Sequence, residues 1–420
     1  MNKVKQGRGR SKQEVKRLMA AEEATIRSGL INGRIELIQQ LIPLGLEAVS
    51  QELQAEVSRL VGGESHQRTE SNLCRWGSNP GSVVLGDQKV AIEVPRVRDQ
   101  ERMQEVPLES YQQLRKSSGL DDKVFSHLIN GLSAKRYGQA AELVPETFGI
   151  SKSSVSRRFK KATEKRLREL CERDLSEYDI VAIFIDGKHL GDTDIVIALG
   201  ITLDGVKVPL GFIETSTENG TVCKEFINDL KDRGLNTEQE ILCVIDGSKG
   251  LHKGVKAALG EKAIVQRCQW HKRENVLSYL PKKLQSKFRN KLQVAYEQPT
   301  YAKAKKKLMT IRKELKLINE SAVASLDEGL EETLTLHKLG VFKELGKGFK
   351  TTNSIENLNR QIQSYTGRVC RWQNSSQRRR WIASALLEVE PRLNKVAGYK
   401  SLALLREKMR KQQTELKKAA

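Results

Sequence analysis

The sequence of 420 residues lacks any long hydrophobic run. A membrane-spanning helix needs about 20 consecutive apolar residues, whereas the best candidate, residues 180–185, is a run of six. The basic N-terminal segment is not followed by an apolar stretch, so it does not have the pattern of a secretory signal. We therefore expect a cytoplasmic protein with no membrane partner.

Cysteine is also scarce, with 6 residues and no Cys-x-x-Cys pair. Disulfide frameworks and closed zinc sites both use cysteines at short, regular spacings. We therefore expect reduced thiols and no structural zinc. The sequence also has no GxxxxGK[ST], no GxGxxG after a strand, no GxSxG and no HExxH, which argues against the nucleotide-binding and hydrolytic enzymes that carry these motifs.

Acidic residues are outnumbered, with 52 Asp and Glu against 73 Lys and Arg, so the formal net charge is +21. The excess is clustered. Residues 1–17 contain seven basic residues and one acidic residue, residues 282–316 contain twelve and two, and a third excess lies in residues 400–418. Clusters of one sign favour a polyanionic partner, because each neutralised phosphate releases counterions. The alternative is a basic surface that serves only solubility.

The first part of the chain is predicted to be mainly helical. Apolar residues recur at helical spacing from residue 11 to about residue 61, with Pro43 and Gly62-Gly63 as interruptions. A Gly/Asn/Pro/Ser stretch at 77–82 precedes a hairpin over residues 83–94, with its turn at Gly86-Asp87. We expect Pro95 and Pro107 to end the hairpin.

A helix-turn-helix is predicted over residues 119–172. A helix before Pro145 is followed by a turn at 148–150, and Ser151 or Ser153 can cap a second helix. The polar face of the second helix carries Lys152, Ser154, Arg157, Arg158, Lys160 and Lys161. This outline is typical of a DNA-reading unit. An ordinary helix pair with a solvated basic face is the alternative.

The central third indicates a ribonuclease-H-like sheet. Strands are predicted at 180–185, 195–203 and 206–213, then a helix, a strand at 241–245, another helix and a strand at 263–267. A doubly wound sheet would not begin with an antiparallel meander. After Arg267 the sequence reads as helix throughout.

Two aspartates follow apolar strands of this sheet. Asp186 and Asp246 stand at the predicted C-terminal ends of the first and fourth strands. If these strands are neighbours, the carboxylates meet at one edge and repel each other unless a divalent cation is bound. The alternative is an ordinary Asp-Gly turn, as we expect for Asp204-Gly205.

A third carboxylate lies at a predicted helix start. Thr352 or Asn353 is the expected cap, and Glu356 falls in the first turn beside a buried stripe. The stripe consists of Ile355, Leu358 and Ile362. Glu356 could complete a metal site, or it could only complement the helix dipole.

The segment between these carboxylates contains Cys268-x-x-His271, which is half of a zinc site with no second half nearby. A structural hydrogen-bonding role is therefore favoured over metal binding. Trp270 is flanked by polar and basic residues and could stack on an unpaired base, or it could be a core residue.

Taken together, these motifs resemble the Mutator-family DDE transposases of bacterial insertion sequences. The resemblance covers residues 75–390 in order. It is carried by Asp186, by Asp-Gly-x-Lys-Gly at 246–250, by Cys268-x-x-His271 and by Thr-Thr-Asn-Ser-Ile-Glu-Asn-Leu-Asn-Arg at 351–360. The family implies a ribonuclease-H-like catalytic domain interrupted by an all-helical insertion, with a DNA-binding N-terminal region.

The resemblance also implies residue roles. Asp186, Asp246 and Glu356 would be catalytic and would bind Mg²⁺, with Mn²⁺ as a substitute, while Cys268 and His271 form an auxiliary signature. The spacing of 110 residues from Asp246 to Glu356 leaves room for the basic helical insertion. The expected activity is binding of terminal inverted repeats, DNA cleavage and strand transfer into target DNA. A homodimer or larger assembly, associated with the bacterial nucleoid, is expected.

We divide the chain accordingly into a basic helical region (1–70), a β-hairpin and linker (71–118), the helix-turn-helix (119–172), the first part of the catalytic core (173–275), the basic insertion (276–345), the second part of the core (346–400) and a basic helical tail (401–420). The expected DNA contacts are Lys152, Ser154, Arg157, Arg158, Lys161, Trp270, Lys282, Lys283, Arg289, Lys306 and Arg360. Two alternatives remain: a nuclease that cuts without joining, and a DNA-binding regulator whose catalytic fold is degenerate.

Overall fold

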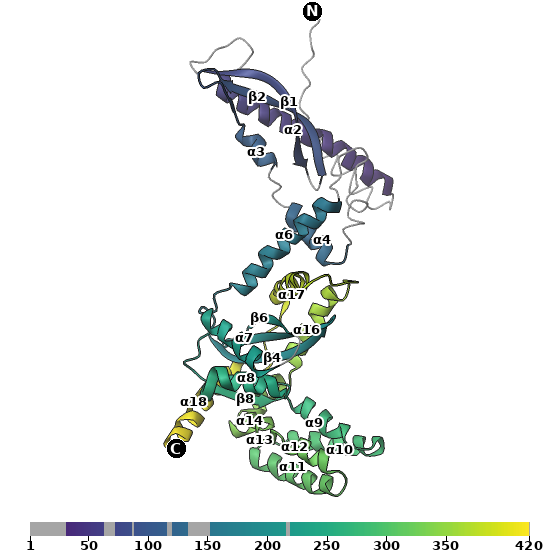
Figure 1. Cartoon of the computed structure of the whole chain (residues 1–420), viewed down its shortest axis with the longest axis vertical. Coiled ribbons are helices and arrows are strands. Elements are labelled where there is room, and N and C mark those ends of the chain that lie inside the picture. The colour runs from purple at the N-terminus through teal and green to yellow at the C-terminus, as the bar shows by residue number, and fades with distance from the viewer. Residues whose placement is uncertain are drawn as a thin grey trace, which may run out of the picture. The chain divides into compact units, whose positions relative to one another are not determined.

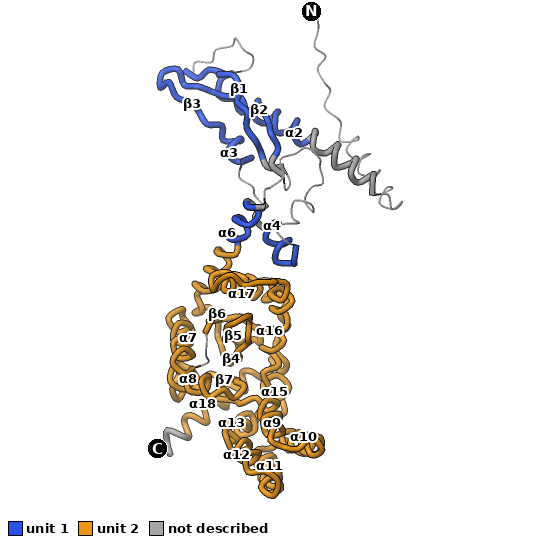
Figure 2. Tube along the Cα trace, turned by 45° about the vertical axis from the view of Figure 1, so that its right-hand side comes forward, with its two compact units in different colours: residues 1–162 blue, residues 163–420 orange. Residues whose placement is uncertain are grey.

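The computed structural model describes residues 31–62, 72–85, 88–115, 120–132, 152–215 and 219–419. The chain divides into two compact units, residues 1–162 and 163–420, and the boundary falls inside helix α6 (Lys152–Cys171) (Figure 2). Each unit has its own sheet, of three and five strands respectively, so the protein is of the mixed α/β class. Among the described helices, none combines the length and the apolar character that crossing a membrane requires.

The first unit is built from a helix packed on an antiparallel sheet. Helix α2 (Ile31–Val61) is followed by strands β1 (Leu73–Leu85), β2 (Gln88–Asp99) and β3 (Gln104–Val106), and then by helix α3 (Glu109–Arg115). Val49, Leu53 and Val57 recur every four residues along one face of α2 and pack with apolar residues of the sheet. This apolar contact is the core of the unit.

Two predicted boundaries in this unit are wrong. The hairpin is longer than expected, because β1 includes the stretch 77–82 and β2 continues past Pro95. Pro95 lies opposite Ser78, next to a register shift in β1, and a strand tolerates a residue without an N–H at such an irregularity. Helix α2 also continues through Pro43, which removes one intrahelical hydrogen bond without ending the helix.

Only part of the predicted helix-turn-helix is described. Helices α4 (Leu120–Ile129) and α6 pack through Phe125 and Phe159, whose ring centroids are 6.1 Å apart. Val155 and Phe159 are buried, as their spacing predicts. The predicted helix before Pro145 and the turn at 148–150 lie outside the described residues, so the motif stays a prediction.

The second unit contains the five-stranded sheet, in the order β6-β5-β4-β7-β8. Its strands are β4 (Ile180–Leu190), β5 (Thr193–Thr202), β6 (Lys207–Thr215), β7 (Ile241–Ile245) and β8 (Ala263–Arg267). The first three form an antiparallel meander, and β7 and β8 add in parallel beside β4. Helices α7 (Gly220–Asp232) and α8 (Lys249–Leu259) connect the later strands. The predicted order of elements is confirmed.

The two faces of this sheet are covered by different helices (Figure 1). Ile183 and Ile185 of β4 belong to the apolar cluster formed with α7 and α8. Successive strand residues point to opposite faces, so Phe184 and Asp186 face the other way. There Phe184 stacks on Phe349, with ring centroids 5.5 Å apart. This second layer comprises α15 (Phe342–Phe349), α16 (Asn353–Thr366) and α17 (Ser375–Val389).

All described elements after Arg267 are helical, as predicted. Six helices lie between β8 and α15: α9 (Gln269–Ser278), α10 (Lys282–Tyr296), α11 (Tyr301–Lys316), α12 (Glu320–Asp327), α13 (Leu330–Thr333) and α14 (Thr335–Lys338). Helices α9 to α13 share an apolar cluster that includes Phe288, Leu308 and Leu326. Near the C-terminus, α18 (Leu402–Ala419) is held by Arg406, whose Nη1 is 2.7 Å from Oδ2 of Asp179.

Candidate active site

The parallel pairing of β4 and β7 places two aspartates side by side. Ile185 is opposite Ile245 in this register, and Asp186 and Asp246 are the next residues along the two strands. The expectation that these strands are neighbours is therefore confirmed. One detail is corrected: Asp186 lies inside β4, because the pairing of β4 with β5 continues to Leu190 after the pairing with β7 has stopped.

Asp186 is almost fully buried, with 8% of its surface exposed. Its Oδ2 accepts a hydrogen bond from Nδ2 of Asn359 over 2.8 Å. The Asn359 carbonyl in turn accepts a hydrogen bond from Nζ of Lys188 over 3.0 Å. Burial lowers the pKa of Lys188, and the nearby charge of Asp186 partly opposes this change. The three residues hold helix α16 against strand β4.

Asp246 occupies the turn between β7 and α8. Its Oδ1 accepts a hydrogen bond from the backbone N–H of Ser248 over 2.8 Å, and the Ser248 side chain caps α8. Gly247 has a φ of +118°, a conformation that L side chains rarely adopt. The turn therefore fixes the Asp246 carboxylate just beyond the end of the sheet.

Glu356 lies in the first turn of α16 and is half-buried. Its Oε1 accepts a hydrogen bond from Oγ1 of Thr352 over 2.6 Å. Asn359, the residue bound to Asp186, follows Glu356 by three positions, so the two side chains lie on the same face of the helix. The predicted buried stripe of Ile355, Leu358 and Ile362 is confirmed.

Cys268 and His271 flank Glu356 from helix α9. The backbone N–H of Cys268 donates to the carbonyl of Ile245 over 2.8 Å, which places Cys268 beside the end of β7. Oγ1 of Thr352 is 3.5 Å from Sγ of Cys268 and 3.3 Å from Nδ1 of His271. Cys268 and His271 therefore lie between the residue that precedes Asp246 and the threonine that contacts Glu356.

The electrostatics of this pair are coupled. A hydrogen bond to Cys268, followed by the charges of Cys268, Asp246 and Glu356, raises the pKa of His271 to about 9 against the cost of burial. Burial acts to raise the pKa of the Cys268 thiol, but hydrogen bonds with His271 outweigh it and the pKa is lowered. Both shifts favour a cationic imidazole next to the carboxylates.

The donor chemistry at this edge fits a hard divalent cation, because carboxylate oxygens are the ligands that Mg²⁺ prefers. Within the described residues, however, no three His, Cys, Asp or Glu side chains are gathered closely enough to hold a metal ion. Asp186, Asp246 and Glu356 each use one oxygen to accept a hydrogen bond. The fold thus places Asp186, Asp246 and Glu356 at the same edge of the sheet, while each carboxylate is held by its own hydrogen bond.

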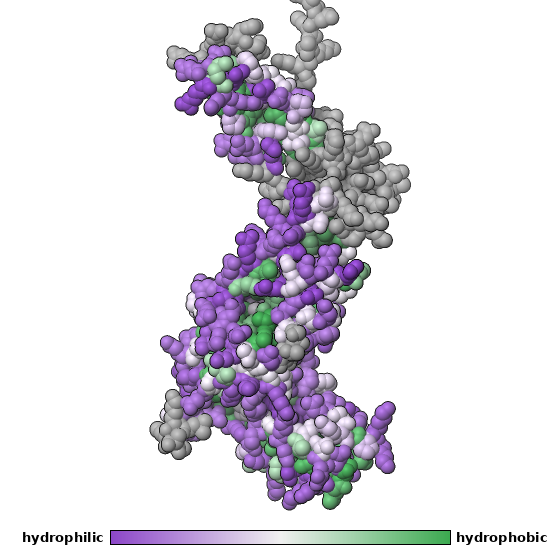
Figure 3. Space-filling model, in the orientation of Figure 1, coloured by the Kyte–Doolittle hydropathy of each residue, from purple (hydrophilic) through white to green (hydrophobic). Residues whose placement is uncertain are grey.

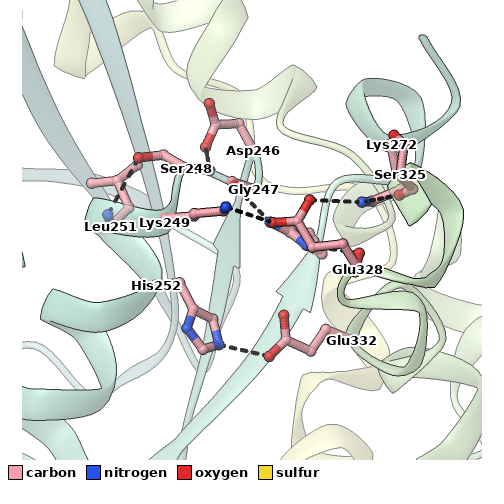
Figure 4. Close-up of polar contacts among 11 residues, drawn as sticks. Asp246, Gly247, Ser248, Lys249, Leu251, His252, Lys272, Ser325, Glu328 and Glu332 are labelled. Atoms are coloured by element: carbon pink, nitrogen blue, oxygen red, sulfur yellow. Dashed lines mark hydrogen bonds and ion pairs between the residues drawn. The ribbon is translucent and has the colours of Figure 1, made fainter. Parts of the chain in front are cut away.

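A second polar cluster ties the helical insertion to the Asp246 turn (Figure 4). Arg267 donates from Nη1 to the carbonyl of Glu328 over 2.9 Å and from Nη2 to the carbonyl of Gly247. Lys249 and Lys272 approach the Glu328 carboxylate from opposite sides, at 3.9 and 3.7 Å. Arg267 and Lys272 are buried, whereas Lys249 is 90% exposed.

The expected DNA contacts are distributed over both units. Lys282, Lys283, Lys306 and Arg360 are exposed, whereas Nη2 of Arg289 forms an ion pair with Glu274 at 2.8 Å. Trp270 is 46% exposed rather than a core residue, and its ring meets that of His271 edge-on. On α6, Arg157 and Lys161 are exposed and Arg158 is half-buried. The side chains of Lys152 and Ser154 lie outside the described part of the structure.

Sequence reasoning missed the contacts of Asn359, Lys188 and Thr352. Asn359 follows Glu356 by three residues, and Lys188 follows Asp186 by two, so each shares a face with a candidate carboxylate. This spacing was the available signal. The pairing of each residue with a partner far along the chain depends on how α16 packs on β4.

Known proteins resemble this chain over most of its length. The sequence model of the family described as "Transposase, Mutator family" matches residues 13–392. The chain is 27% identical to the transposase for insertion sequence element ISRM5 of Rhizobium meliloti, over 76% of this chain and 80% of that protein. It is 25% identical to the transposase for IS256 in transposon Tn4001 of Staphylococcus aureus, over 81% and 87%. It is 23% identical to the transposase for IS406 of Burkholderia multivorans, over 90% and 95%.

Proposed function

The chain belongs to the Mutator family of transposases, and from this premise we propose that it binds the terminal inverted repeats of an insertion sequence, cleaves DNA at the element ends and joins those ends to target DNA. The catalytic residues of this proposal are Asp186, Asp246 and Glu356. The observation that carries it is the parallel register of Ile185 with Ile245, because this register sets the two aspartates next to each other.

The sheet order supports a ribonuclease-H-like catalytic core. An antiparallel meander, β6-β5-β4, is extended in parallel by β7 and β8. Asp186 lies on β4, and Asp246 directly follows the neighbouring strand β7. Glu356 comes from α16, which the Asn359–Asp186 hydrogen bond fastens to β4. In this proposal the helices α9–α14 are the insertion that separates the second aspartate from the glutamate.

Asp186, Asp246 and Glu356 would hold Mg²⁺, or Mn²⁺ in its place. Bound at such a site, the metal supplies charge that activates the attacking oxygen and stabilises the leaving oxygen of a phosphodiester. The chain's own residues position these groups. Asn359 keeps Asp186 in a fixed orientation, and the Ser248 N–H does the same for Asp246. Phosphoryl transfer leaves the protein little covalent work, so positioning of this kind matters most.

DNA binding is proposed for the basic surfaces. The second unit has a mainly hydrophilic surface in the view of Figure 3, although hydrophilic and hydrophobic residues are mixed over the helical insertion. There Lys282, Lys283 and Lys306 are exposed and could contact phosphates of the element end. In the first unit, α6 would read the terminal repeats as the second helix of a helix-turn-helix. Two ends must be joined together, so a dimer or larger assembly on DNA is proposed.

The test uses linear DNA that carries the sequences flanking the gene, with purified full-length protein. We expect wild-type protein to cleave at the flanking repeats in Mg²⁺ and not in EDTA, and Glu356→Gln to abolish cleavage without loss of DNA binding. Glu344→Gln is the matched control, because Glu344 is also in the first turn of a helix, α15, but is exposed.

A supercoiled target plasmid added to the same reaction distinguishes the alternatives. Joined products support a transposase, whereas cleavage without joining would favour a nuclease. Equal cleavage by wild type and Glu356→Gln would remove Glu356 from the site. Binding that does not depend on Mg²⁺, with no cleavage by wild type, would favour a DNA-binding regulator.

A further inference from the structure

Thr352 does not use its hydroxyl in the way its position leads one to expect. It is the N-cap residue of α16, where a threonine side chain normally accepts a hydrogen bond from a backbone N–H of the first turn. No such bond is formed, and Thr352 has a φ of −79° and a ψ of 12°, outside the extended region typical of a capping residue. The side chain is completely buried.

The hydroxyl instead faces three functional groups. Oγ1 is 2.6 Å from Oε1 of Glu356, 3.3 Å from Nδ1 of His271 and 3.5 Å from Sγ of Cys268. A hydroxyl has one proton to donate and can accept through its lone pairs. The 2.6 Å contact has the length of a charge-assisted O–H···O⁻ bond, so the proton is donated to Glu356. The hydroxyl is then an acceptor toward His271.

This arrangement connects Glu356 to the sheet edge. The backbone N–H of Cys268 donates to Ile245 at the end of β7, and the N–H of Gln269 donates to Lys350 just before α16, over 2.8 and 2.9 Å. The starts of α9 and α16 are therefore fixed to each other and to the strand that precedes Asp246. Thr352 forms the hydrogen bond that connects these two helix starts to the Glu356 carboxylate.

We propose that Thr352 is a positioning residue for Glu356, whose Oε1 it holds so that Oε2 faces the metal site, and that His271 orients the Thr352 hydroxyl. The inference rests on the proposed function and assigns a task to the Cys268-x-x-His271 signature. Within the described residues Oε2 of Glu356 has no hydrogen-bond donor of its own. Carboxylates that bind metals are commonly oriented by a hydrogen bond of this kind, and losing it typically reduces metal affinity or activity by roughly 10- to 100-fold.

The experiment compares Thr352→Val, which keeps the shape and removes the hydroxyl, with Thr352→Ser, which keeps the hydroxyl. Thr351→Val is the matched control, because Thr351 is the neighbouring buried threonine and forms no side-chain hydrogen bond with the described residues. Three quantities are measured on full-length protein: Mn²⁺ affinity of the complex with end DNA by electron paramagnetic resonance, the Mg²⁺ concentration for half-maximal cleavage, and affinity for end DNA.

We expect Thr352→Val to weaken Mn²⁺ binding and to raise the Mg²⁺ requirement by roughly 10- to 100-fold, with end-DNA affinity unchanged within about twofold. Thr352→Ser should restore most of the loss, and Thr351→Val should match wild type. Wild-type Mn²⁺ affinity in Thr352→Val would overturn the inference. So would an equal loss of DNA affinity and metal affinity, because that pattern indicates a structural role only.

Two further measurements keep the test decisive. If Thr352→Val fails to fold, His271→Phe removes Nδ1 and must show the same selective weakening of Mn²⁺ binding; normal binding would overturn the inference. The failure of the proposed function is recognised separately, because wild-type protein would then not cleave end DNA. If wild type cleaves, Glu356→Gln does not and Thr352→Val behaves as wild type, only the positioning role is wrong.

Discussion

Asn359 donates a hydrogen bond from Nδ2 to Oδ2 of Asp186 over 2.8 Å, although 173 positions separate the two residues in the chain. Both residues are buried, so water cannot easily replace the bond. Because Glu356 lies one turn before Asn359 on the same helix, this contact also sets the distance between Asp186 and the third candidate carboxylate.

Replacing Asn359 should therefore impair cleavage more than folding. In Asn359→Ala, Asp186 loses the hydrogen bond from Nδ2 of Asn359, and we expect cleavage of end DNA to fall by roughly 10- to 100-fold while DNA affinity is retained. Asn357→Ala is the control, since Asn357 is exposed on the same helix and, within the described part of the chain, its side chain accepts a hydrogen bond from Gln361 alone. Cleavage by Asn359→Ala at the wild-type rate would contradict the positioning of Asp186 by α16.

The buried guanidinium of Arg267 should contribute strongly to stability. In Arg267→Met the carbonyls of Gly247 and Glu328 lose their donor, and an unsatisfied buried acceptor costs about 1–3 kcal/mol. We expect the free energy of unfolding in urea to fall by about 2–5 kcal/mol. Lys249 approaches the same Glu328 from an exposed position. Lys249→Met should therefore change the free energy of unfolding by less than about 1 kcal/mol. Equal losses in both variants would show that burial does not distinguish the two cations.

The buried ammonium of Lys272 predicts a pH-dependent stability. Burial, together with the charge of Arg267, lowers the pKa of Lys272 to about 8, against the opposing charges of Glu328 and Glu332. The unfolded value is about 10.4, so between these limits the unfolded chain binds more protons and stability rises with pH. Below about pH 8 the buried ammonium of Lys272 destabilises the folded state in full. This destabilisation decreases as the pH rises above the folded pKa.

Lys272→Met isolates this effect, because the titrations of all other groups largely cancel in the comparison. We expect the free energy of unfolding of wild type, relative to Lys272→Met, to increase between pH 8 and 10 with a slope that approaches about 1.4 kcal/mol per pH unit. Urea titrations at pH 7, 8, 9 and 10 measure it. A difference that stays constant over this range would mean that Lys272 titrates normally.

Two adjacent lysines on α11 allow a test of whether an exposed lysine of this helix contacts DNA phosphates. Lys306 is exposed and forms no ion pair with the described residues, whereas Nζ of Lys305 is 2.9 Å from Glu331. We expect Lys306→Ala to reduce the slope of log K against log salt for end DNA by about 0.9, and Lys305→Ala to change it little. Binding measured between 50 and 300 mM salt decides this. Identical slopes for both variants and wild type would remove α11 from the DNA interface.

The sequence alone indicated much of the second unit. The apolar runs before Asp186 and Asp246 predicted two buried strands, and the capped start at 351–360 predicted the helix that carries Glu356. These features are local, because they depend on hydrophobic periodicity, turn dipeptides and helix capping. The hairpin of the first unit was less predictable, since the register shift near Ser78 that accommodates Pro95 depends on the partner strand.

The tertiary structure decided which of these residues meet. The parallel register of β4 with β7 made Asp186 and Asp246 neighbours, and packing of α16 on β4 brought Asn359 to Asp186. Thr352 shows the limit most clearly: its position in the sequence correctly predicted a helix cap, yet its hydroxyl is directed to Glu356, His271 and Cys268. Periodicity and capping are properties of a few consecutive residues, whereas the contacts of Thr352 with His271 and Cys268 join segments more than 80 positions apart, and only the packed chain fixes them.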